Sequence, residues 1–416
     1  MLGFFRKSNI PDQLNICMTS YKFPLSERTS EYGFLFPIAK GLVQAGHKVT
    51  VISSQSNPTT FEMVKDGVQI HFIDPKLQRR TNFPTEVRRK FSELHKLNRF
   101  HIVHSLDSSG SPIARRRKLY KLATAFDVRG TQLSQMFSIL SMKRESLSNM
   151  LKTDFVMVYK FLRTYWGTDR KVLKSADAVF VSSPAERIAL ERYYYYPDAR
   201  MFTVPYGVQF KSDIDIQAIE KISHKYNLTS DNQCVVTISD MTSIDSIKNL
   251  LKAFQKVSIK KPDARLIILG HGPLLHQLEY EVYSLALGSK VILTGAVTDE
   301  QIFDYISVGQ VFVNLSSRST GFEPSLLVAM SQGKTIIGSE TSAISSIVED
   351  GIEGFLVRPA DIQTLSQLIL DIFRGQLNTQ EIGKRASLKV KDLFDTDKMV
   401  KTTIDAYKKI LNRSHY

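Results

Sequence analysis

The sequence predicts an α/β protein with two doubly wound parallel-sheet domains that face each other across a cleft. Its 416 residues exceed the about 250–300 residues at which one hydrophobic core stops growing. Each half of the chain alternates short, β-branched apolar runs with stretches of helical periodicity, as strand–helix–strand units do. We place the first domain at 1–209 and the second at 210–394. A last helix within 395–416 is expected to pack back on the first domain.

Composition narrows the class of protein. The chain is 43% hydrophobic and 23% charged, which is typical of a globular protein. No apolar run reaches the about 20 residues of a membrane-spanning helix, and the first residues lack the apolar core of a signal peptide. Cys17 and Cys234 fall in the first predicted strand of each half, which favours buried thiols in a reducing compartment over a disulfide. We therefore expect a cytoplasmic protein.

Basic residues gather in one part of the first half. Between Lys76 and Lys121 there are thirteen Lys and Arg residues against three acidic ones, so much of the net charge of +14 lies there. One interpretation is a solvated basic face. Another is contact with an anionic acceptor or membrane surface, where each nearby cation contributes about 1 kcal/mol. Nucleic acid ranks last, because the region has little aromatic interleaving and no nucleic-acid motif.

The first half contains candidate residues at the ends of predicted strands. We predict strands at Leu14–Ser20, His47–Ser53, Val68–Ile73, Ile102–Ser105, Ala123–Val128, Lys174–Ser183 and Met201–Val204. The loop after the first strand has no Gly-x-Gly fingerprint, so a dinucleotide site is not expected there. His104 either satisfies hydrogen bonds in the core or faces the cleft. Asp127 and Arg129 stand at the carboxyl end of a strand, where substrate contact is one of two open roles.

The second half repeats the pattern, and its loops converge where ligands bind to such sheets. We predict strands at Val235–Ser239, Arg265–Leu269, Val291–Thr294, Val311–Val313, Thr335–Gly338 and Gly354–Val357. A polar loop at 316–321 then leads to Pro324, which is suited to the first position of a helix. A strand that enters a helix through such a loop presents free backbone N–H groups and a positive dipole end, which suit phosphate. An ordinary strand–loop–helix unit is the alternative.

Several short segments follow one another along the chain: Gly46–Val51, Phe126–Gly130, Ala176–Ser183, Pro205–Val208, Gly270–Pro273 and Val348–Val357. These segments resemble glycosyltransferase family 4, the sugar transferases with two Rossmann-like domains known as the GT-B fold. Each segment is weak alone, but their order and spacing cover nearly the whole chain. The resemblance implies transfer of a sugar from a nucleotide-diphosphate sugar to an acceptor hydroxyl, usually with retention and without a metal or other cofactor.

The resemblance and the strand ends together give the candidate residues. Candidate catalytic residues are His104, Asp127 and Glu323, and candidate acceptor-side residues are Arg129 and Tyr206. Glu323 either lines the sugar pocket or caps its own helix. The candidate donor-binding residues are Ser239, Lys248, Gly270, His271, Gly272, Arg318, Thr320, Gly321, Phe322, Glu323, Pro324, Ser325 and Leu326. The implied partners are a nucleotide sugar, an anionic or lipid-linked glycan acceptor at the inner face of the membrane, and a partner transferase.

The donor site departs from the family pattern. Asp240 and Asp245 stand where the family has the Arg and Lys that bind diphosphate, and a close pair of like charges costs about 4 kcal/mol at a dielectric constant of about 20. Thr320 and Val328 stand where the family has two glutamates. Either Arg318, Lys248 or Lys334 supplies the missing charge in an active enzyme, or the chain is a non-catalytic scaffold or partner subunit.

Overall fold

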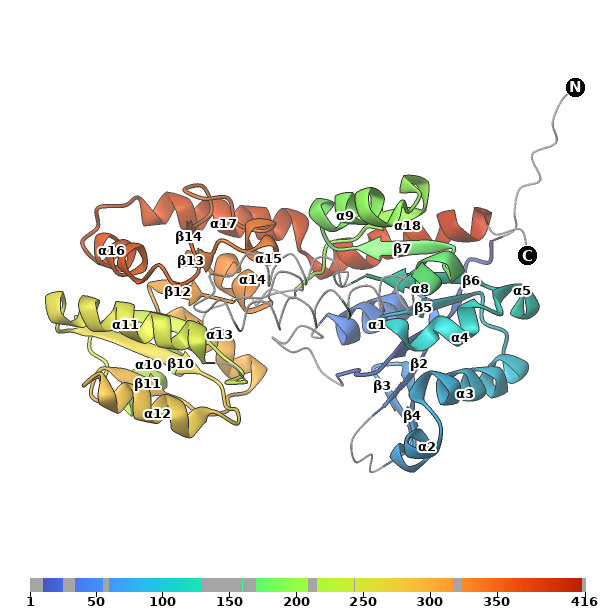
Figure 1. Cartoon of the computed structure of the whole chain (residues 1–416), viewed down its shortest axis with the longest axis horizontal. Coiled ribbons are helices and arrows are strands. Elements are labelled where there is room, and N and C mark those ends of the chain that lie inside the picture. The colour runs from blue at the N-terminus through green and yellow to red at the C-terminus, as the bar shows by residue number, and fades with distance from the viewer. Residues whose placement is uncertain are drawn as a thin grey trace, which may run out of the picture. The chain divides into compact units, whose positions relative to one another are not determined.

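The computed structural model describes residues 10–24, 34–54, 60–128, 159, 170–208, 215–242, 244–316 and 324–413. They form two compact units (Figure 1). The first unit contains the described residues up to Gly207 and the chain from Thr396 onward, and the second contains Val208–Asp395. The chain therefore passes between the units twice. The predicted fold class, two α/β units with parallel sheets, is confirmed.

The first unit has an eight-stranded sheet in the order β3-β4-β2-β1-β5-β6-β7-β8. Every described pairing in it is parallel except that of β3 with β4. Asp66 and Gly67 join this hairpin with φ of 48° and 79°, as a two-residue type I′ turn requires. The strands are β1 (Asn15–Ser20), β2 (Lys48–Ser54), β3 (Glu62–Lys65), β4 (Val68–Ile73), β5 (Ile102–Ser105), β6 (Ala123–Asp127), β7 (Ala178–Val181) and β8 (Met201–Thr203).

The helices of the first unit cover both faces of this sheet. On one face, Phe83, Val87 and Phe91 of α3 pack on Cys17 and Val103. On the other, α1 lies so close to α18 that a Cβ on Gly41 would come within 2.4 Å of Val400. The helices are α1 (Leu35–Gln44), α2 (Pro75–Arg80), α3 (Phe83–Leu97), α4 (Ser111–Ala114), α5 (Arg117–Tyr120), α8 (Arg170–Ser175), α9 (Pro184–Tyr194) and α18 (Thr396–Arg413), with 3-10 turns η1 (Ser108–Gly110) and η3 (Asp198–Arg200).

The second unit has a six-stranded sheet, parallel in every described pairing, in the order β11-β10-β9-β12-β13-β14. Its strands are β9 (Gln233–Ile238), β10 (Ala264–Leu269), β11 (Val291–Leu293), β12 (Val311–Asn314), β13 (Thr335–Ser339) and β14 (Phe355–Val357). Its helices are α10 (Ile216–Lys225), α11 (Asp245–Lys260), α12 (Leu275–Ser284), α13 (Asp299–Val308), α14 (Pro324–Ser331), α15 (Ser342–Ser345), α16 (Ile362–Phe373) and α17 (Thr379–Leu393). Helices α11, α12 and α16 share one apolar core with β9, β10 and β12.

The structure bears on the predicted cysteines, on one predicted strand and on membrane-spanning helices. Cys17 and Cys234 are both free and buried, as predicted. The strand predicted at Lys174–Ser183 is too long, because α8 continues to Ser175 and β7 covers only Ala178–Val181. None of the helices in the described ranges is long and apolar enough to cross a membrane.

Candidate functional site

The second unit changes the direction of its connections between β9 and β12, which are neighbours in the sheet. The chain leaves β9 toward β10 on one side, and leaves β12 toward β13 on the other. Ligands of open α/β sheets bind at such a point, beyond the carboxyl ends of the strands. We call the edge where the parallel strands end the carboxyl edge, and the opposite one the amino edge.

The loops that follow β9 and β10 are pressed together at this carboxyl edge. Ser239 N–H donates to Leu269 O at 2.9 Å, and Gly270 N–H donates to Gly295 O at 3.1 Å. A Cβ on Gly270, whose φ is +123°, would lie 1.9 Å from Ser239 O, and one on Gly272 would lie 1.9 Å from the Asp240 carbonyl oxygen. Only glycine therefore fits at these two predicted donor-binding positions. His271, between them, is exposed.

Helix α14 follows β12 in the chain and leads to β13. Pro324, Ser325 and Leu326 are buried in its first turn, and the predicted start at Pro324 is confirmed. The hydroxyl of Ser339, at the end of β13, donates to Ser316 O beyond the end of β12. The predicted donor residues Arg318, Thr320, Gly321, Phe322 and Glu323 lie outside the described residues, as does the acceptor-side Arg129.

Two of the three cations predicted to replace the missing positive charge have other partners. Lys248 Nζ lies 2.6 Å from a carboxylate oxygen of Glu281 on α12. Lys334 Nζ donates to Ser307 O at 2.7 Å, and burial lowers its pKa to about 8. Because Lys334 immediately precedes β13, it also lies at the amino edge, away from the candidate site. Arg318 is thus the remaining candidate of the three.

Asp240 and Asp245, the two carboxylates expected to repel a diphosphate, have local structural roles. Asp240 Oδ1 accepts hydrogen bonds from the Thr242 N–H at 3.1 Å and the Thr242 hydroxyl at 2.8 Å. Asp245 is the first residue of α11, where a carboxylate favours the positive end of the helix dipole. A further cation, Arg358, follows β14 at the carboxyl edge; its exposed side chain is paired with Glu340, with Nε 3.9 Å from a carboxylate oxygen.

In the first unit, the structure brings His104 and Asp127 together with a residue from the far end of the chain. His104 is fully buried, and its Nδ1 lies 2.7 Å from the hydroxyl of Tyr407 on α18. Its Nε2 lies 3.4 Å from Asp127 Oδ2; that contact falls outside hydrogen-bond geometry, and the described residues offer Nε2 no other partner. The His104 ring is thus enclosed between Tyr407 and Asp127, and its side chain has no exposed surface.

Glu186 adds a second carboxyl group to this region. Its Oε2 accepts hydrogen bonds from the Ser182 N–H at 2.7 Å and the Ser182 hydroxyl at 2.9 Å, just beyond β7. The pKa of Glu186 is raised to about 7, mainly by burial and to a smaller extent by the Asp127 charge, and the Ser182 hydrogen bonds partly oppose this rise. Two carboxyl groups, those of Asp127 and Glu186, thus lie along the carboxyl edge of β6 and β7.

A polar network that sequence reasoning missed lies at the other switch point, between β1 and β5. The Thr19 hydroxyl contacts Ser105 Oγ and Ser109 Oγ, each at 3.0 Å. Asp107 accepts the Tyr21 N–H at 2.6 Å and the Ser109 N–H at 2.8 Å. The available signal was a short run of aspartate, serines and glycine directly after a buried strand.

Tyr206 serves packing in the first unit. Its ring is buried and stacks on Phe34 with centroids 3.8 Å apart. This contact fixes the turn after β8 to the start of α1, and it leaves little of the ring accessible to an acceptor.

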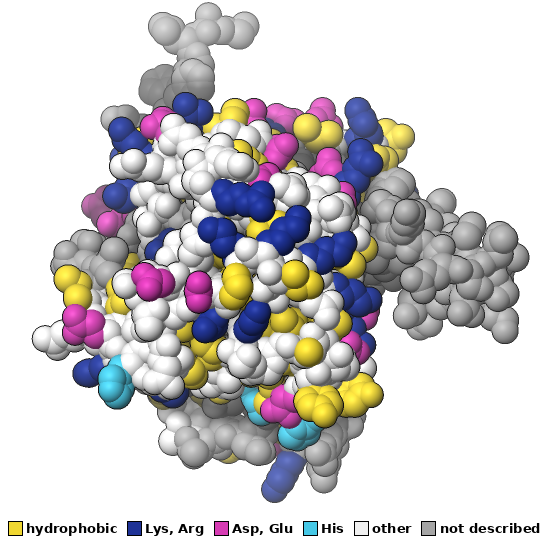
Figure 2. All heavy atoms as spheres, turned by 90° about the vertical axis from the view of Figure 1, so that its left-hand side faces the viewer, with side chains coloured by type: hydrophobic (Ala, Val, Ile, Leu, Met, Phe, Trp, Pro, Cys, Tyr) yellow, Lys and Arg dark blue, Asp and Glu magenta, His cyan; other side chains and the backbone are white. Residues whose placement is uncertain are grey.

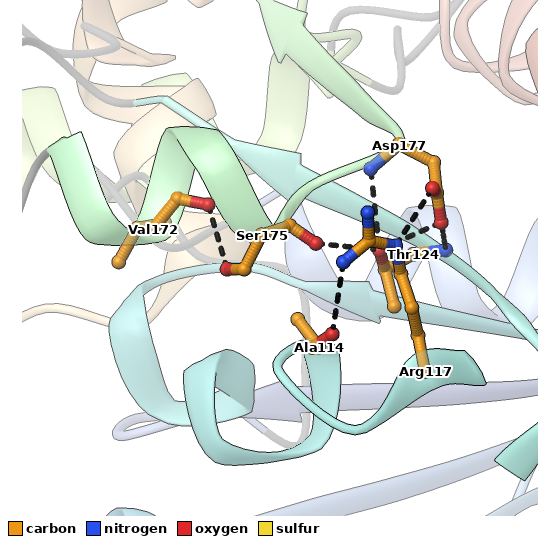
Figure 3. Close-up of polar contacts among 6 residues, drawn as sticks. All are labelled: Ala114, Arg117, Thr124, Val172, Ser175 and Asp177. Atoms are coloured by element: carbon orange, nitrogen blue, oxygen red, sulfur yellow. Dashed lines mark hydrogen bonds and ion pairs between the residues drawn. The ribbon is translucent and has the colours of Figure 1, made fainter. Parts of the chain in front are cut away.

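The basic region between Lys76 and Lys121 is divided by the fold. Lys76 lies on α2, directly after the carboxyl end of β4, whereas Arg117 lies on α5, directly before β6. Figure 3 shows that Arg117 is structural: its Nε donates to Asp177 Oδ1 at 2.9 Å, and Asp177 in turn accepts the Thr124 N–H at 2.9 Å. The predicted basic region is therefore not one continuous face.

The described residues contain no group of three or more His, Cys, Asp or Glu side chains placed to hold a metal ion. The donors available at both carboxyl edges are backbone N–H groups, hydroxyls and a few cations. Such donors suit a negatively charged or hydroxyl-rich ligand.

Comparison with known proteins gives two family matches. Residues 36–207 match a family described as "Glycosyl transferase 4-like domain" and residues 232–374 match "Glycosyl transferases group 1". The chain is 22% identical over 193 residues to N-acetyl-alpha-D-glucosaminyl L-malate synthase of Bacillus anthracis, covering 46% of this chain and only 48% of that protein. It is 20% identical over 379 residues to an uncharacterized glycosyltransferase of Methanocaldococcus jannaschii, covering 89% of this chain and 92% of that protein.

The fold also resembles solved structures. The crystal structure of HepE from Anabaena in complex with UDP-glucose superposes with a TM-score of 0.69 at 14% identity, covering 94% of this chain and 99% of that one. At this identity the likeness concerns the fold.

Proposed function

We infer that this chain, a member of the GT-B glycosyltransferases of the family 4 and group 1 type, takes its sugar from a nucleotide diphosphate and passes it to an acceptor hydroxyl. The observation that carries the proposal is the carboxyl edge of the second unit. There the glycine loop after β10 packs closely on the loop after β9 at the switch point between β9 and β12, and α14 begins after β12. HepE, a protein of similar fold, binds UDP-glucose.

In the proposed reaction, the acceptor hydroxyl forms a bond to the anomeric carbon while the bond from that carbon to the diphosphate oxygen breaks. The diphosphate leaves with the electron pair, on the face where the hydroxyl enters, so that configuration is retained. Backbone N–H groups at the start of α14 and the Arg318 guanidinium stabilise the growing negative charge. The reaction as proposed needs no metal ion.

On the acceptor side, Asp127 is the proposed group that orients the hydroxyl and receives its proton. It lies at the carboxyl edge of β6, with Oδ2 3.4 Å from Nε2 of His104, whose Nδ1 lies 2.7 Å from the Tyr407 hydroxyl. In this proposal the Tyr407 hydroxyl donates to Nδ1 of His104, so that an N–H group at Nε2 faces Asp127. No contact among the described residues favours the non-catalytic alternative.

The acceptor is proposed to be an anionic or lipid-linked glycan, reached by a peripheral contact of the first unit with the inner face of the membrane. The basic residues between Lys76 and Lys121 support this contact.

A thermal-shift screen against UDP, GDP, ADP and dTDP, each with and without its sugar, tests the donor proposal. Binding at 100 times Kd adds about 2.7 kcal/mol to the free energy of unfolding, so one nucleotide should raise Tm clearly. The shift should disappear in Arg318→Ala and persist in the control Arg358→Ala, which removes an exposed cation from the same edge. The proposal would be contradicted if none of the nucleotides raised Tm, or if the rise in Tm persisted in Arg318→Ala.

A further inference from the structure

The cations of the first unit that lie at its amino edge form a surface of their own. Helix α3 connects the end of β4 to the start of β5, and α5 directly precedes β6, so the end of α3 and all of α5 lie at the amino edge (Figure 1). Asn15, the first residue of β1, confirms this by donating to Arg99 O at 3.0 Å. We call the set Lys96, Leu97, Arg99, Arg116, Lys118 and Leu119 the amino-edge patch.

The two parts of the patch are joined by Tyr120. Its hydroxyl lies 2.8 Å from Ser92 Oγ, and its ring packs on Phe91 and His95 of α3, with centroids 5.1 and 5.6 Å away. Because Tyr120 is turned into the core, its neighbour Leu119 is turned outward. The end of α3 and α5 therefore present one surface.

Two leucines stand out from this surface. Leu97 is 85% exposed and Leu119 is 75% exposed. A single exposed leucine is ordinary, and these two are informative only because of the charges that surround them.

The four basic side chains of the patch are exposed and have no polar partner among the described residues. All four side chains are exposed, and within the described part of the chain none of them makes a hydrogen bond or ion pair. Between Leu94 and Leu122 the only acidic residue is Asp107, which belongs to the network at the carboxyl edge. The nearby acid Asp177 is already neutralised by Arg117.

In the second unit, some basic side chains stabilise the fold by donating hydrogen bonds to the ends of helices. Figure 2 shows Lys and Arg side chains gathered on a face of that unit. Within the second unit, Lys261 donates to Phe373 O at 3.4 Å and Lys290 donates to Ser258 O at 2.8 Å. Both carbonyls lie in the last turn of a helix, where a cation offsets the negative dipole end. The four basic side chains of the amino-edge patch make no such contact with a described residue.

We propose that the amino-edge patch docks the first unit on an anionic lipid bilayer. Leu97 and Leu119 enter the boundary between headgroups and acyl chains, and the surrounding Lys and Arg side chains bind lipid phosphates. This rests on the membrane contact proposed above and narrows it to six residues. Aliphatic side chains suit lipid, whereas single-stranded nucleic acid is bound through exposed aromatic rings, and no aromatic side chain of 94–122 is exposed.

Docking in this way has a consequence for the acceptor. The patch is at the amino edge, and Asp127 is at the carboxyl edge of the same sheet. Strands of four to six residues place these edges about 15–20 Å apart at about 3.3 Å per residue. The docked unit would therefore act on an acceptor hydroxyl that is well separated from the bilayer surface, as in an extended lipid-linked glycan.

Vesicle flotation of the full chain tests the proposal without any nucleotide. We expect binding to phosphatidylcholine vesicles that contain phosphatidylglycerol, and little binding to phosphatidylcholine alone. Arg116→Gln with Lys118→Gln should weaken binding about 30-fold, at about fivefold per cation. Leu97→Ser with Leu119→Ser should weaken it about tenfold for each leucine.

Matched controls come from the second unit. Lys252→Gln with Lys260→Gln removes two exposed lysines of α11, and Ile259→Ser with Tyr283→Ser removes two apolar side chains that are 76% and 81% exposed. Both controls should bind vesicles like the parent chain. Equal losses in patch and control variants, equal binding to both kinds of vesicle, or a patch that binds a short RNA but not vesicles would each overturn the proposal. Since the nucleotide screen uses no lipid, failure here leaves the donor proposal untouched.

Discussion

The carboxyl edges of the two units are built in different ways. In the first unit, buried side chains bind one another: His104 lies between Tyr407 and Asp127, and Thr19 lies between two serines. In the second unit, the edge is made of backbone, with Gly270 and Gly272 pressed against neighbouring carbonyl groups. A side-chain network can move protons and orient a hydroxyl, whereas exposed backbone N–H groups suit a phosphate.

This difference determines how substitutions affect the stability of each carboxyl edge. A backbone-built edge has no tolerance for an added Cβ, so a small substitution has a large effect. A network of buried polar groups loses hydrogen bonds one at a time, and its stability depends on pH. The predictions below use this contrast, from the largest expected effect to the smallest.

Gly270→Ala tests the backbone-built edge most severely. The new methyl group would meet Ser239 O, and φ is +123°, so we expect a loss of about 3 kcal/mol or more in the free energy of unfolding. Gly295→Ala is the matched control, because its φ is +71° and nothing lies within 4 Å of the added Cβ. It should cost only about 1 kcal/mol. Urea unfolding measures both, and equal costs would contradict the close approach of the loops.

Glu186→Gln tests the charge state of the side-chain edge. Burial raises the folded-state pKa of Glu186 to about 7, from an ordinary value of 4.5, so the folded protein binds more protons than the unfolded chain between these two pH values. Stability therefore falls as pH rises from about 4.5 to 7. The glutamine side chain does not titrate, so the variant does not lose stability in this way, and its amide oxygen can still accept hydrogen bonds from Ser182. At pH 8 it should be more stable by up to about 3 kcal/mol, with little gain at pH 4.5; an equal gain at both pH values would refute the assignment.

Tyr407→Phe removes the hydroxyl that contacts His104 and leaves a buried ring nitrogen without a partner. We expect a loss of about 1–3 kcal/mol, measured by chemical unfolding. Tyr280→Phe, at a side chain that is 68% exposed, is the control and should change nothing measurable. If both variants unfold like the parent chain, the contact between α18 and β5 contributes nothing to stability.

Lys248→Gln should have the smallest effect. Its partner Glu281 lies 2.6 Å away and both side chains are partly exposed, so the ion pair contributes below about 1 kcal/mol. Because this charge is already balanced, the nucleotide-dependent rise in Tm should be unchanged. A lost nucleotide shift in this variant would restore Lys248 as a diphosphate ligand.

Local pattern was sufficient for most of the fold. The strand at Ile102–Ser105 and the helix start at Pro324 coincide with the structure, because apolar runs and proline act through neighbouring residues. The strand β3 was missed although Asp66-Gly67 is a hairpin signal. Its two apolar residues are adjacent in a four-residue strand between charged residues, so the sequence shows no alternation of apolar and polar residues.

The candidate site was predictable only in part. Strand ends identified His104 and Asp127, but not Tyr407, which is 303 residues from His104 in sequence. No local pattern records such a contact, since it depends on the crossing of α18 back to the first unit. The same holds for Lys248 and Lys334: sequence shows their charge, and only the fold shows that Glu281 and Ser307 already bind them.

Hydrogen exchange with and without the nucleotide that emerges from the thermal screen tests the central claim most directly. The account predicts slower exchange of backbone N–H groups in three segments of the second unit, 239–242, 270–274 and 314–326. Little change is expected at 105–110 in the first unit. Protection of the first-unit network alone, or of neither edge, would contradict a donor site built on backbone at the carboxyl edge of β9 and β12.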